Sequence, residues 1–142
     1  MKKLLCLGFA LAFFLPNLAA AQSVQAHIDQ GIENSQKGKY DQAIKDFNAA
    51  LKLKPRDPAL FTYRGVVYYA KGQYDQAMKD FNQALEIDPK FGRAYYQRGM
   101  VYENQEKYAQ AVAEMKQAKS VGWFVDPLWL EILENKAAAQ KK

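Results

Sequence analysis

The side chains that could perform covalent or acid–base chemistry are few in this chain. It has one cysteine, Cys6, one histidine, His27, and the serines Ser23, Ser35 and Ser120. A serine or cysteine nucleophile needs a base beside it, and His27 is the only imidazole in the sequence. We expect His27 to face water on the first helix. The sequence therefore predicts no catalytic site and a protein that is not an enzyme.

Ligands for a metal or a cofactor are equally sparse. A zinc site needs several histidines or cysteines, and the chain has one of each. The glutamate pairs at 103 and 106 and at 131 and 134 are spaced like ordinary helix-face charges and lack the ligand density of a calcium loop. The glycines follow a repeat rather than a phosphate-binding loop. We predict neither a metal nor a cofactor.

The first 21 residues have the pattern of a cleavable export signal. Lys2 and Lys3 precede a short apolar run, which Pro16 ends and Ala19-Ala20-Ala21 follows. The run is shorter than the roughly 20 residues needed to cross a bilayer, so we predict cleavage after Ala21 rather than a membrane anchor. The mature domain, residues 22–142, is then expected to be secreted or in the periplasm of a Gram-negative bacterium, with no integral membrane segment.

The charge of this mature domain argues against nucleic acid as a partner. Loss of Lys2 and Lys3 lowers the formal charge from +5 to +3, and the lysines are interspersed with acidic residues. Loss of Cys6 also leaves no disulfide. The stability of one domain of this length must then come from packing alone.

A 34-residue repetition organises the rest of the chain. The segment KGKYDQAIKDFN at 37–48 recurs as KGQYDQAMKDFN at 71–82, and a looser copy, KYAQAVAEM, lies at 107–115. A fixed period of this length indicates stacked supersecondary units, each of which needs its neighbours to bury its apolar face.

The repeated residues resemble the tetratricopeptide repeat (TPR) family, whose unit is a helix–turn–helix. The second repeat matches at Phe61, Gly65, Tyr68, Ala77, Phe81 and Pro89. The third matches at Tyr95, Gly99, Tyr102, Ala111 and Met115, with Trp123 in place of the proline. The first keeps Gly31, Ala43, Phe47 and Pro55 but has His27 and Asn34 at the aromatic places. The resemblance implies an all-α solenoid with repeats near 24–57, 58–91 and 92–125.

Local signals support the same elements. Gly31, Gly65 and Gly99 recur on first helices near 24–37, 58–71 and 92–105, where a neighbouring helix must approach closely. Gly38 and Gly72 suit the left-handed residue that ends such a helix.

Both ends of the array carry signs of capping. The first helix has His27, Gln30 and Asn34 where inner repeats have aromatic residues or arginine. A last helix near 126–139 begins at Asp126-Pro127. We expect its Trp129, Ile132 and Leu133 to cover the third repeat, which gives seven helices in all.

Matching charges on consecutive repeats suggest a link between them. Arg64 and Arg98 occupy equivalent places on first helices, and Asp46 and Asp80 occupy equivalent places on the preceding second helices. We predict the pairs Arg64–Asp46 and Arg98–Asp80, with unrelated surface charges as the alternative. A partly exposed pair contributes about 0–1 kcal/mol, so its role would be register.

The resemblance also implies a binding surface on the concave face lined by the first helices. The groove residues carried over from the family form an apolar, tyrosine-rich strip: Ile28, Ile32, Thr62, Tyr63, Val66, Tyr69, Arg93, Tyr96, Gln97 and Met100. The apolar members could instead fill contacts between adjacent first helices. Family members that clamp chaperone tails use Lys, Asn and Arg, and only Arg93 has a matching type here, so that specialised function does not carry over.

The sequence thus favours a scaffold that holds a segment of another protein, of unknown identity, in this groove. The alternative is a structural module that self-associates into a homo-oligomer or an envelope assembly. Leu128, Leu130 and residues 123–125 could provide an apolar contact for that role, or could pack internally.

Overall fold

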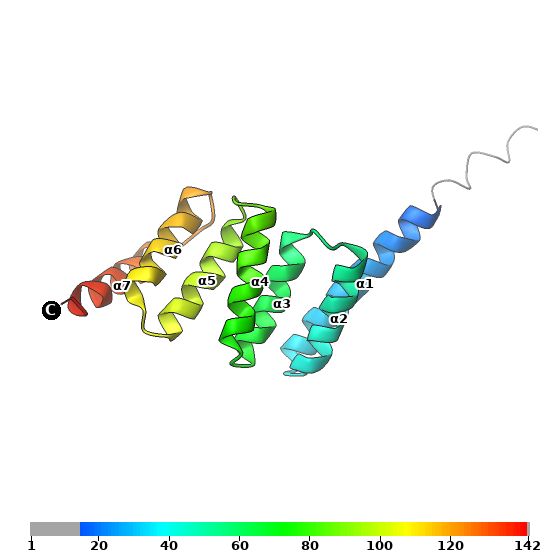
Figure 1. The fold of residues 1–142 in the computed structure, drawn as a ribbon, viewed down its shortest axis with the longest axis horizontal. Helices are drawn as coiled ribbons and strands as arrows, with labels where there is room; N and C mark the ends of the chain where they lie inside the picture. Colours follow the sequence, from blue (N-terminus) through cyan, green and yellow to red (C-terminus); the bar gives the residue numbers. More distant parts are fainter. Residues whose placement is uncertain (1–14, 142) are drawn as a thin grey trace, which may run out of the picture.

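The computed structural model describes residues 15–141, and its side chains from residue 21 except that of Gln22. In this range the chain forms seven helices and no strand: α1 Leu15–Gln36, α2 Tyr40–Leu53, α3 Pro58–Ala70, α4 Tyr74–Ile87, α5 Gly92–Asn104, α6 Tyr108–Ser120 and α7 Pro127–Ala139. They stack along the long axis of the molecule (Figure 1).

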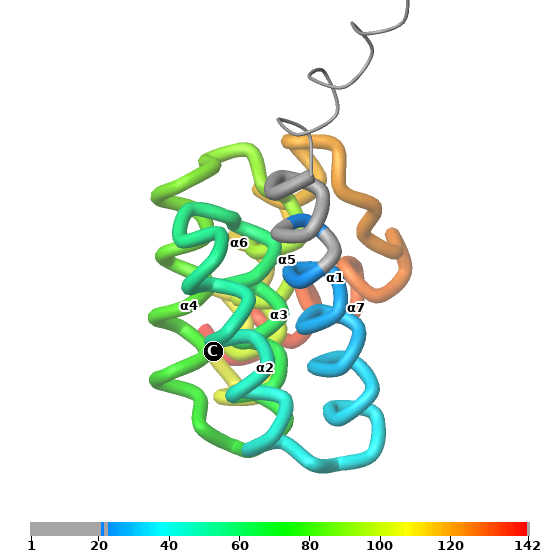
Figure 2. Tube along the Cα trace, turned by 90° about the vertical axis from the view of Figure 1, so that its right-hand side faces the viewer, coloured from blue at the N-terminus to red at the C-terminus, as the bar shows by residue number. Residues whose placement is uncertain are grey.

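Three helical hairpins and one final helix make up the stack. The closest packing is within the pairs α1–α2, α3–α4 and α5–α6, and α7 packs on α6. The pairs α2–α3 and α4–α5 join successive hairpins, and α3 also touches both α1 and α5. The end-on view shows the successive hairpins lying one behind another (Figure 2). The all-α solenoid expected from the 34-residue period is confirmed.

The first helix is longer than predicted. Within the described residues it already runs from Leu15, whereas the prediction placed its start near residue 24. The alanines at 19–21 then favour continuation. Most of the predicted export signal, including Cys6, lies outside the described residues. Cleavage after Ala21 would remove about two turns of α1.

The first helix of each hairpin ends in the same left-handed turn. Gly38 and Gly72 have φ of 71° and 78°, as predicted, and Glu106 occupies the equivalent place with φ of 58°. In each turn the next residue's N–H donates back to a carbonyl five residues earlier, as from Lys107 N to Tyr102 O at 2.9 Å. The turn geometry is therefore common to all three repeats, although the third lacks glycine.

Two of the three Asp-Pro sequences start helices, and the start at Asp126-Pro127 is as predicted. Asp57 accepts a hydrogen bond from Ala59 N, and Asp126 accepts one from Leu128 N, both at 2.9 Å. Pro58 and Pro127 follow at the first helical position.

Each hairpin is closed by a glycine on its first helix and a large side chain on its second. A Cβ at Gly65 would lie 2.5 Å from Phe81 Cε1, and one at Gly31 would lie 2.8 Å from Phe47 Cζ. In the third repeat a Cβ at Gly99 would lie 2.6 Å from Met115 Cε. These three second-helix side chains are almost fully buried. The close approach predicted from the glycines is confirmed.

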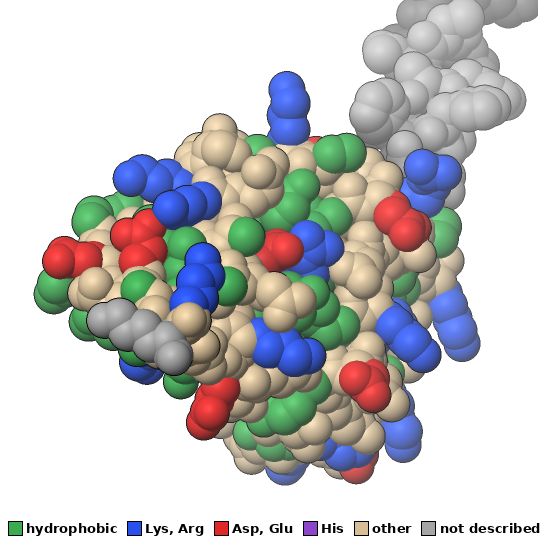
Figure 3. Space-filling view, turned by 60° about the vertical axis from the view of Figure 1, so that its left-hand side comes forward, with side chains coloured by type: hydrophobic (Ala, Val, Ile, Leu, Met, Phe, Trp, Pro, Cys, Tyr) green, Lys and Arg blue, Asp and Glu red, His purple; other side chains and the backbone are tan. Residues whose placement is uncertain are grey.

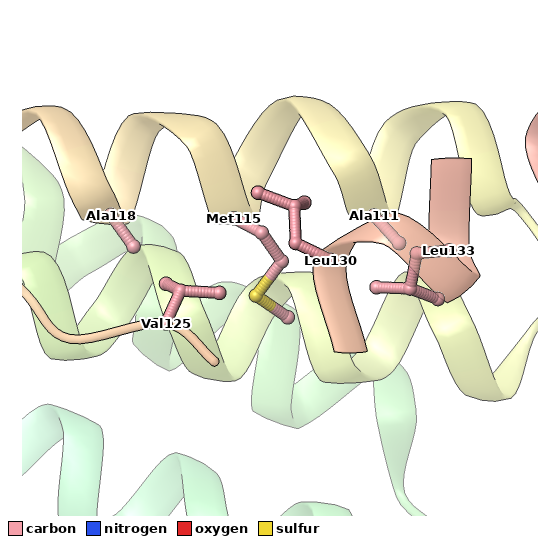
Figure 4. Packing of buried hydrophobic residues seen from close by; sticks show 6 residues of the cluster. All are labelled: Ala111, Met115, Ala118, Val125, Leu130 and Leu133. Carbon is pink, nitrogen blue, oxygen red and sulfur yellow. The ribbon is translucent and has the colours of Figure 1, made fainter. Parts of the chain in front are cut away.

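The last hairpin is covered by α7 through a cluster in which Val125, Leu130 and Leu133 pack on Ala111, Met115 and Ala118 (Figure 4). Trp129 packs against the same cluster. The prediction for Ile132 was wrong, because this side chain points outward and is 44% exposed. Leu130 takes its place, since a helix that buries Leu133 also buries the residue three positions earlier.

The predicted ion pairs were wrong in their acidic partners. Arg64 donates from Nε and Nη2 to Asp80 of its own hairpin, at 2.8 and 2.7 Å, and from Nη1 to Asn48 Oδ1 of the preceding one, at 2.6 Å. Asp46 instead accepts from Asn34 at 2.7 Å. The predicted link between hairpins exists, but an amide forms it.

The same arrangement recurs one repeat later. Arg98 donates to Glu114 of its own hairpin at 3.0 and 2.8 Å and to Asn82 of the preceding one at 2.7 Å. The hydrogen bonds that Arg64 donates to Asp80 raise the pKa of Arg64. Burial raises the pKa of Glu114, although Arg98 opposes the shift.

Aromatic residues of the same helices lie beside these arginines. The Arg64 guanidinium lies 5.5 Å from the ring centre of Phe61 and 6.0 Å from that of Tyr68. Arg98 lies 5.5 Å from the ring centre of Tyr95. Each arginine is therefore held by stacking as well as by hydrogen bonds.

We predict that Gly65→Ala lowers the free energy of unfolding by about 1–3 kcal/mol, because the new methyl group overlaps the rigid ring of Phe81. Gly99→Ala is the matched comparison. It should cost less, because the terminal methyl of Met115 can move aside. Urea unfolding of both variants measures the difference, and equal losses would contradict this account.

We predict that Asp80→Asn lowers the free energy of unfolding by about 3 kcal/mol, since it leaves the half-buried Arg64 without its anionic partner. Glu114→Gln should cost less, because the Arg98–Glu114 pair is more exposed. Asp41→Asn, which removes an exposed pair with Lys71, is the control and should leave stability unchanged. The same urea titration measures all three variants.

Candidate functional site

A pocket of about 280 Å³ lies on the face formed by the first helices, where α1, α3 and α5 meet. Four predicted groove residues line it: Ile32, Tyr63, Val66 and Arg93. Its other lining residues are Ser35, Gln36, Phe47 and Val67. The pocket thus joins residues from three successive hairpins. We call these eight residues the α1–α3–α5 pocket.

Tyr63 and Arg93 form the polar edge of the pocket. The Tyr63 ring stacks on Phe47, with centroids 5.6 Å apart and 11° between the planes. The Arg93 guanidinium carbon lies 4.6 Å from the centre of the Tyr63 ring. No ion pair involves Arg93 among the described residues. Its charge is therefore held in place by the tyrosine ring and is available to an anion.

Two larger hollows of about 420 and 520 Å³ lie around the loop between α2 and α3. Their linings share Pro55 and Arg56 and consist largely of loop residues and exposed helix-end side chains. The α1–α3–α5 pocket is smaller but has the lining typical of binding sites, in which apolar and aromatic side chains surround one placed charge.

Tyr69 lies outside this pocket, one turn further along α3 than Val66. Its ring packs against Tyr74 with centroids 5.6 Å apart. Burial raises the pKa of Tyr69, and Tyr74 and Glu103 raise it further. The phenol therefore stays neutral over the physiological range and acts as a hydrogen-bonding group.

The part of the predicted groove on α5 is largely covered. The ring of Tyr96 lies 5.7 Å from that of Trp129 and 6.4 Å from that of Trp123. Met100 packs against the same cluster under α7. Tyr96 and Met100 are thus partly buried by their packing against α7 and the loop that precedes it.

The remaining predicted groove residues have mixed roles. Thr62 was wrong as a groove residue: its side chain is fully buried, and its hydroxyl donates to Pro58 O at 2.8 Å. Ile28 packs against the cluster of Val24, Ala50, Leu51 and Leu60. Gln97 is half-buried on α5.

Ser35 follows Ile32 by three residues, and the family spacing assigns it to the groove as well. The other three lining residues are absent from the predicted set. Gln36 follows Ile32 by four residues, so helical spacing alone was enough to place it on the same face. Phe47 and Val67 are buried core residues, and only the edges that they present to the pocket make them part of it.

The described residues contain no group of three or more side chains able to hold a metal ion. No helix between residues 15 and 141 is both long enough and apolar enough to span a membrane. The chemistry that this site offers is the reversible binding of an apolar or anionic group.

Several solved structures have the same fold. The first TPR domain of human RPAP3 superimposes with a TM-score of 0.75 at 21% identity, over 84% of this chain and 95% of that one. The first TPR of Spaghetti (RPAP3), bound to the HSP90 peptide SRMEEVD, gives 0.73 at 21%, over 85% and 95%. The TPR2B domain of yeast Sti1, in a complex with pHsp70, gives 0.72 at 24%, over 84% and 98%.

Sequence comparison agrees with the fold. No curated protein matches the chain. The family described as TPR repeat matches residues 35–72 and 65–106, and the one described as tetratricopeptide repeat matches residues 92–121. Together these matches span residues 35–121, which is more than half of the chain, and they cover helices α2 to α6. The chain therefore belongs to the tetratricopeptide repeat family.

Proposed function

We propose that this protein is an exported scaffold that binds a segment of a partner protein in the α1–α3–α5 pocket. The observation that carries the proposal is the unpaired Arg93, held over Tyr63 at the edge of an otherwise apolar pocket. TPR proteins generally act as interaction scaffolds, and two of the similar structures hold chaperone segments. Peptide binding is thus a function that this fold supports.

The size of the pocket favours a peptide over a cofactor. Its volume of about 280 Å³ is just below the range of about 300–1,000 Å³ seen for small-molecule sites. It suits one or two apolar side chains of an extended or helical segment. Arg93 then favours a carboxylate next to them, since a guanidinium and a carboxylate form charge-assisted hydrogen bonds.

The partner need not be a chaperone tail. Chaperone-binding relatives hold a carboxylate with a clamp of Lys, Asn and Arg. The equivalent positions in this chain are Ile28, Ile32, Tyr63, Arg93 and Gln97, and of these only Arg93 is a residue of the clamp type. We therefore define the partner by chemistry, as a segment with an apolar side chain beside an acidic one.

The proposal that the protein is exported rests on the sequence of residues 1–21. Its basic start, short apolar run and alanine triplet are the features of a signal peptide. The periplasm or the exterior is therefore the compartment in which we place the binding reaction.

We predict that Arg93→Glu weakens binding of an apolar–acidic peptide by about tenfold or more, because a charge-assisted hydrogen bond contributes about 1.5–3 kcal/mol. Selection from a random displayed peptide library should give acidic motifs for the unmodified protein and basic motifs for the variant. Lys79→Glu, an equal charge change at an exposed site on α4, is the control. Identical motifs for all three proteins would contradict the assignment of the site.

We predict that the protein isolated from its host begins at Gln22, because a signal peptidase needs the small side chains that precede it. Mass spectrometry of the periplasmic fraction and the culture medium tests this. Replacing Ala19 and Ala21 by Arg should retain the full-length form. Recovery of the intact chain from the cytoplasm of unmodified cells would overturn the export proposal and leave peptide binding untouched.

A further inference from the structure

Exposed apolar side chains gather where the stack ends, on helix α7 and in the loop that precedes it. Among the described residues, five large apolar side chains are exposed, and four of them lie between positions 123 and 132: Trp123 at 39%, Phe124 at 79%, Leu128 at 65% and Ile132 at 44%. The fifth is Leu53, at 47%. The view of this end shows apolar side chains at the surface beside both basic and acidic ones (Figure 3).

Helix α7 therefore has two apolar faces. Its inner face buries Leu130 and Leu133 against the last hairpin. The outer face carries Leu128, Ile132, Asn135 and Ala139, all of which are exposed. A helix that only capped the array would be polar on this side.

The spacing on the outer face is that of a coiled-coil seam. The intervals between Leu128, Ile132, Asn135 and Ala139 are four, three and four residues. In heptad terms Ile132 and Ala139 are at a, and Leu128 and Asn135 are at d. An isoleucine at a with a leucine at d favours a pair of parallel helices.

Charges border the seam on both sides. Glu131 is at the g position and Lys136 at the following e position, and both are exposed. In the part of the chain that the structure describes, no ion pair involves either residue, whereas Glu134 pairs with Lys116 at 2.7 Å. Lys136 Nζ lies 5.1 Å from the centre of the Tyr108 ring, at the edge of the seam.

These charges discriminate between the two ways of pairing identical helices. In a parallel pair with two-fold symmetry, the g residue of one helix meets the next e residue of the other. Each Glu131 would then face the partner's Lys136, twice per dimer. In an antiparallel pair, g faces g and e faces e, so like charges would meet. The charge pattern is therefore self-complementary in the parallel arrangement.

We propose that the outer face of α7 is the contact surface for a second copy of this chain, in a parallel two-fold dimer through Leu128 and Ile132. One helix pair is small beside the roughly 1,200 Å² of a standard interface, so the dimer forms in concentrated solution and dissociates on dilution. The α1–α3–α5 pocket contains no residue of α7, so the dimer leaves both pockets open. Two pockets on one particle raise the avidity for a partner that carries two binding segments.

The test is sedimentation of the purified protein over a series of concentrations up to about 500 µM, a range that detects even weak association. The unmodified chain should pass from monomer to dimer. Leu128→Gln with Ile132→Gln should abolish the dimer without unfolding the monomer, since both side chains are exposed. Leu53→Gln, a comparably exposed leucine at a distance from α7, is the matched control and should leave the dimer unchanged.

Charge reversals test the orientation. Glu131→Lys or Lys136→Glu alone should weaken the dimer by about tenfold, because both attractive pairs become repulsive. The double variant should restore it. A monomer at every concentration, a dimer insensitive to the single reversals, or a monomer that attaches to lipid vesicles through this face would each overturn the proposal.

Discussion

The contact on which the structure depends is the approach of each first helix to the large side chain of its own second helix. Phe47, Phe81 and Met115 occupy the space where a side chain at Gly31, Gly65 or Gly99 would begin. A pair of short helices has little interior of its own, and this contact brings their backbones close enough to exclude water. Arg64 and Arg98 then connect each hairpin to the one before it. The exposed face of the first helices, and with it the pocket, follows from these two sets of contacts.

Local signals were sufficient to predict most of the fold. The left-handed glycines and the Asp126-Pro127 start each act within a few residues, and the 34-residue period repeats along the chain, so the sequence displays all three directly. Features that depend on how two helices face each other were harder to predict from the sequence. Arg64 has an aspartate on the helix before it and another on the helix after it, and only the relative rotation of the helices decides which one it reaches. In the same way, only the rotation of α7 about its axis decides whether Leu130 or Ile132 is buried against the last hairpin.

The site was predicted in part, for a related reason. The family pattern assigns equivalent positions in every repeat to the groove, and Ile32, Tyr63, Val66 and Arg93 do gather in one pocket. Met100 occupies the place of Ile32 and Val66 in the last repeat, but there the next helix is α7 rather than another hairpin. Trp129 of α7 and Trp123 of the preceding loop also pack against Tyr96 beside it. End repeats have different neighbours from inner ones, so equivalence in sequence does not ensure equivalence in exposure.

The same two tryptophans determine which part of the molecule tryptophan fluorescence reports on. Trp123 and Trp129 are the only tryptophans in the chain, and both contact Tyr96 at the C-terminal end of the stack. In a linear array, stability is a sum over neighbouring repeats, and the ends can open separately. Intrinsic fluorescence therefore reports the docking of α7 on the third hairpin. Fraying of α1 and α2, at the opposite end of the molecule, would pass without a change in emission.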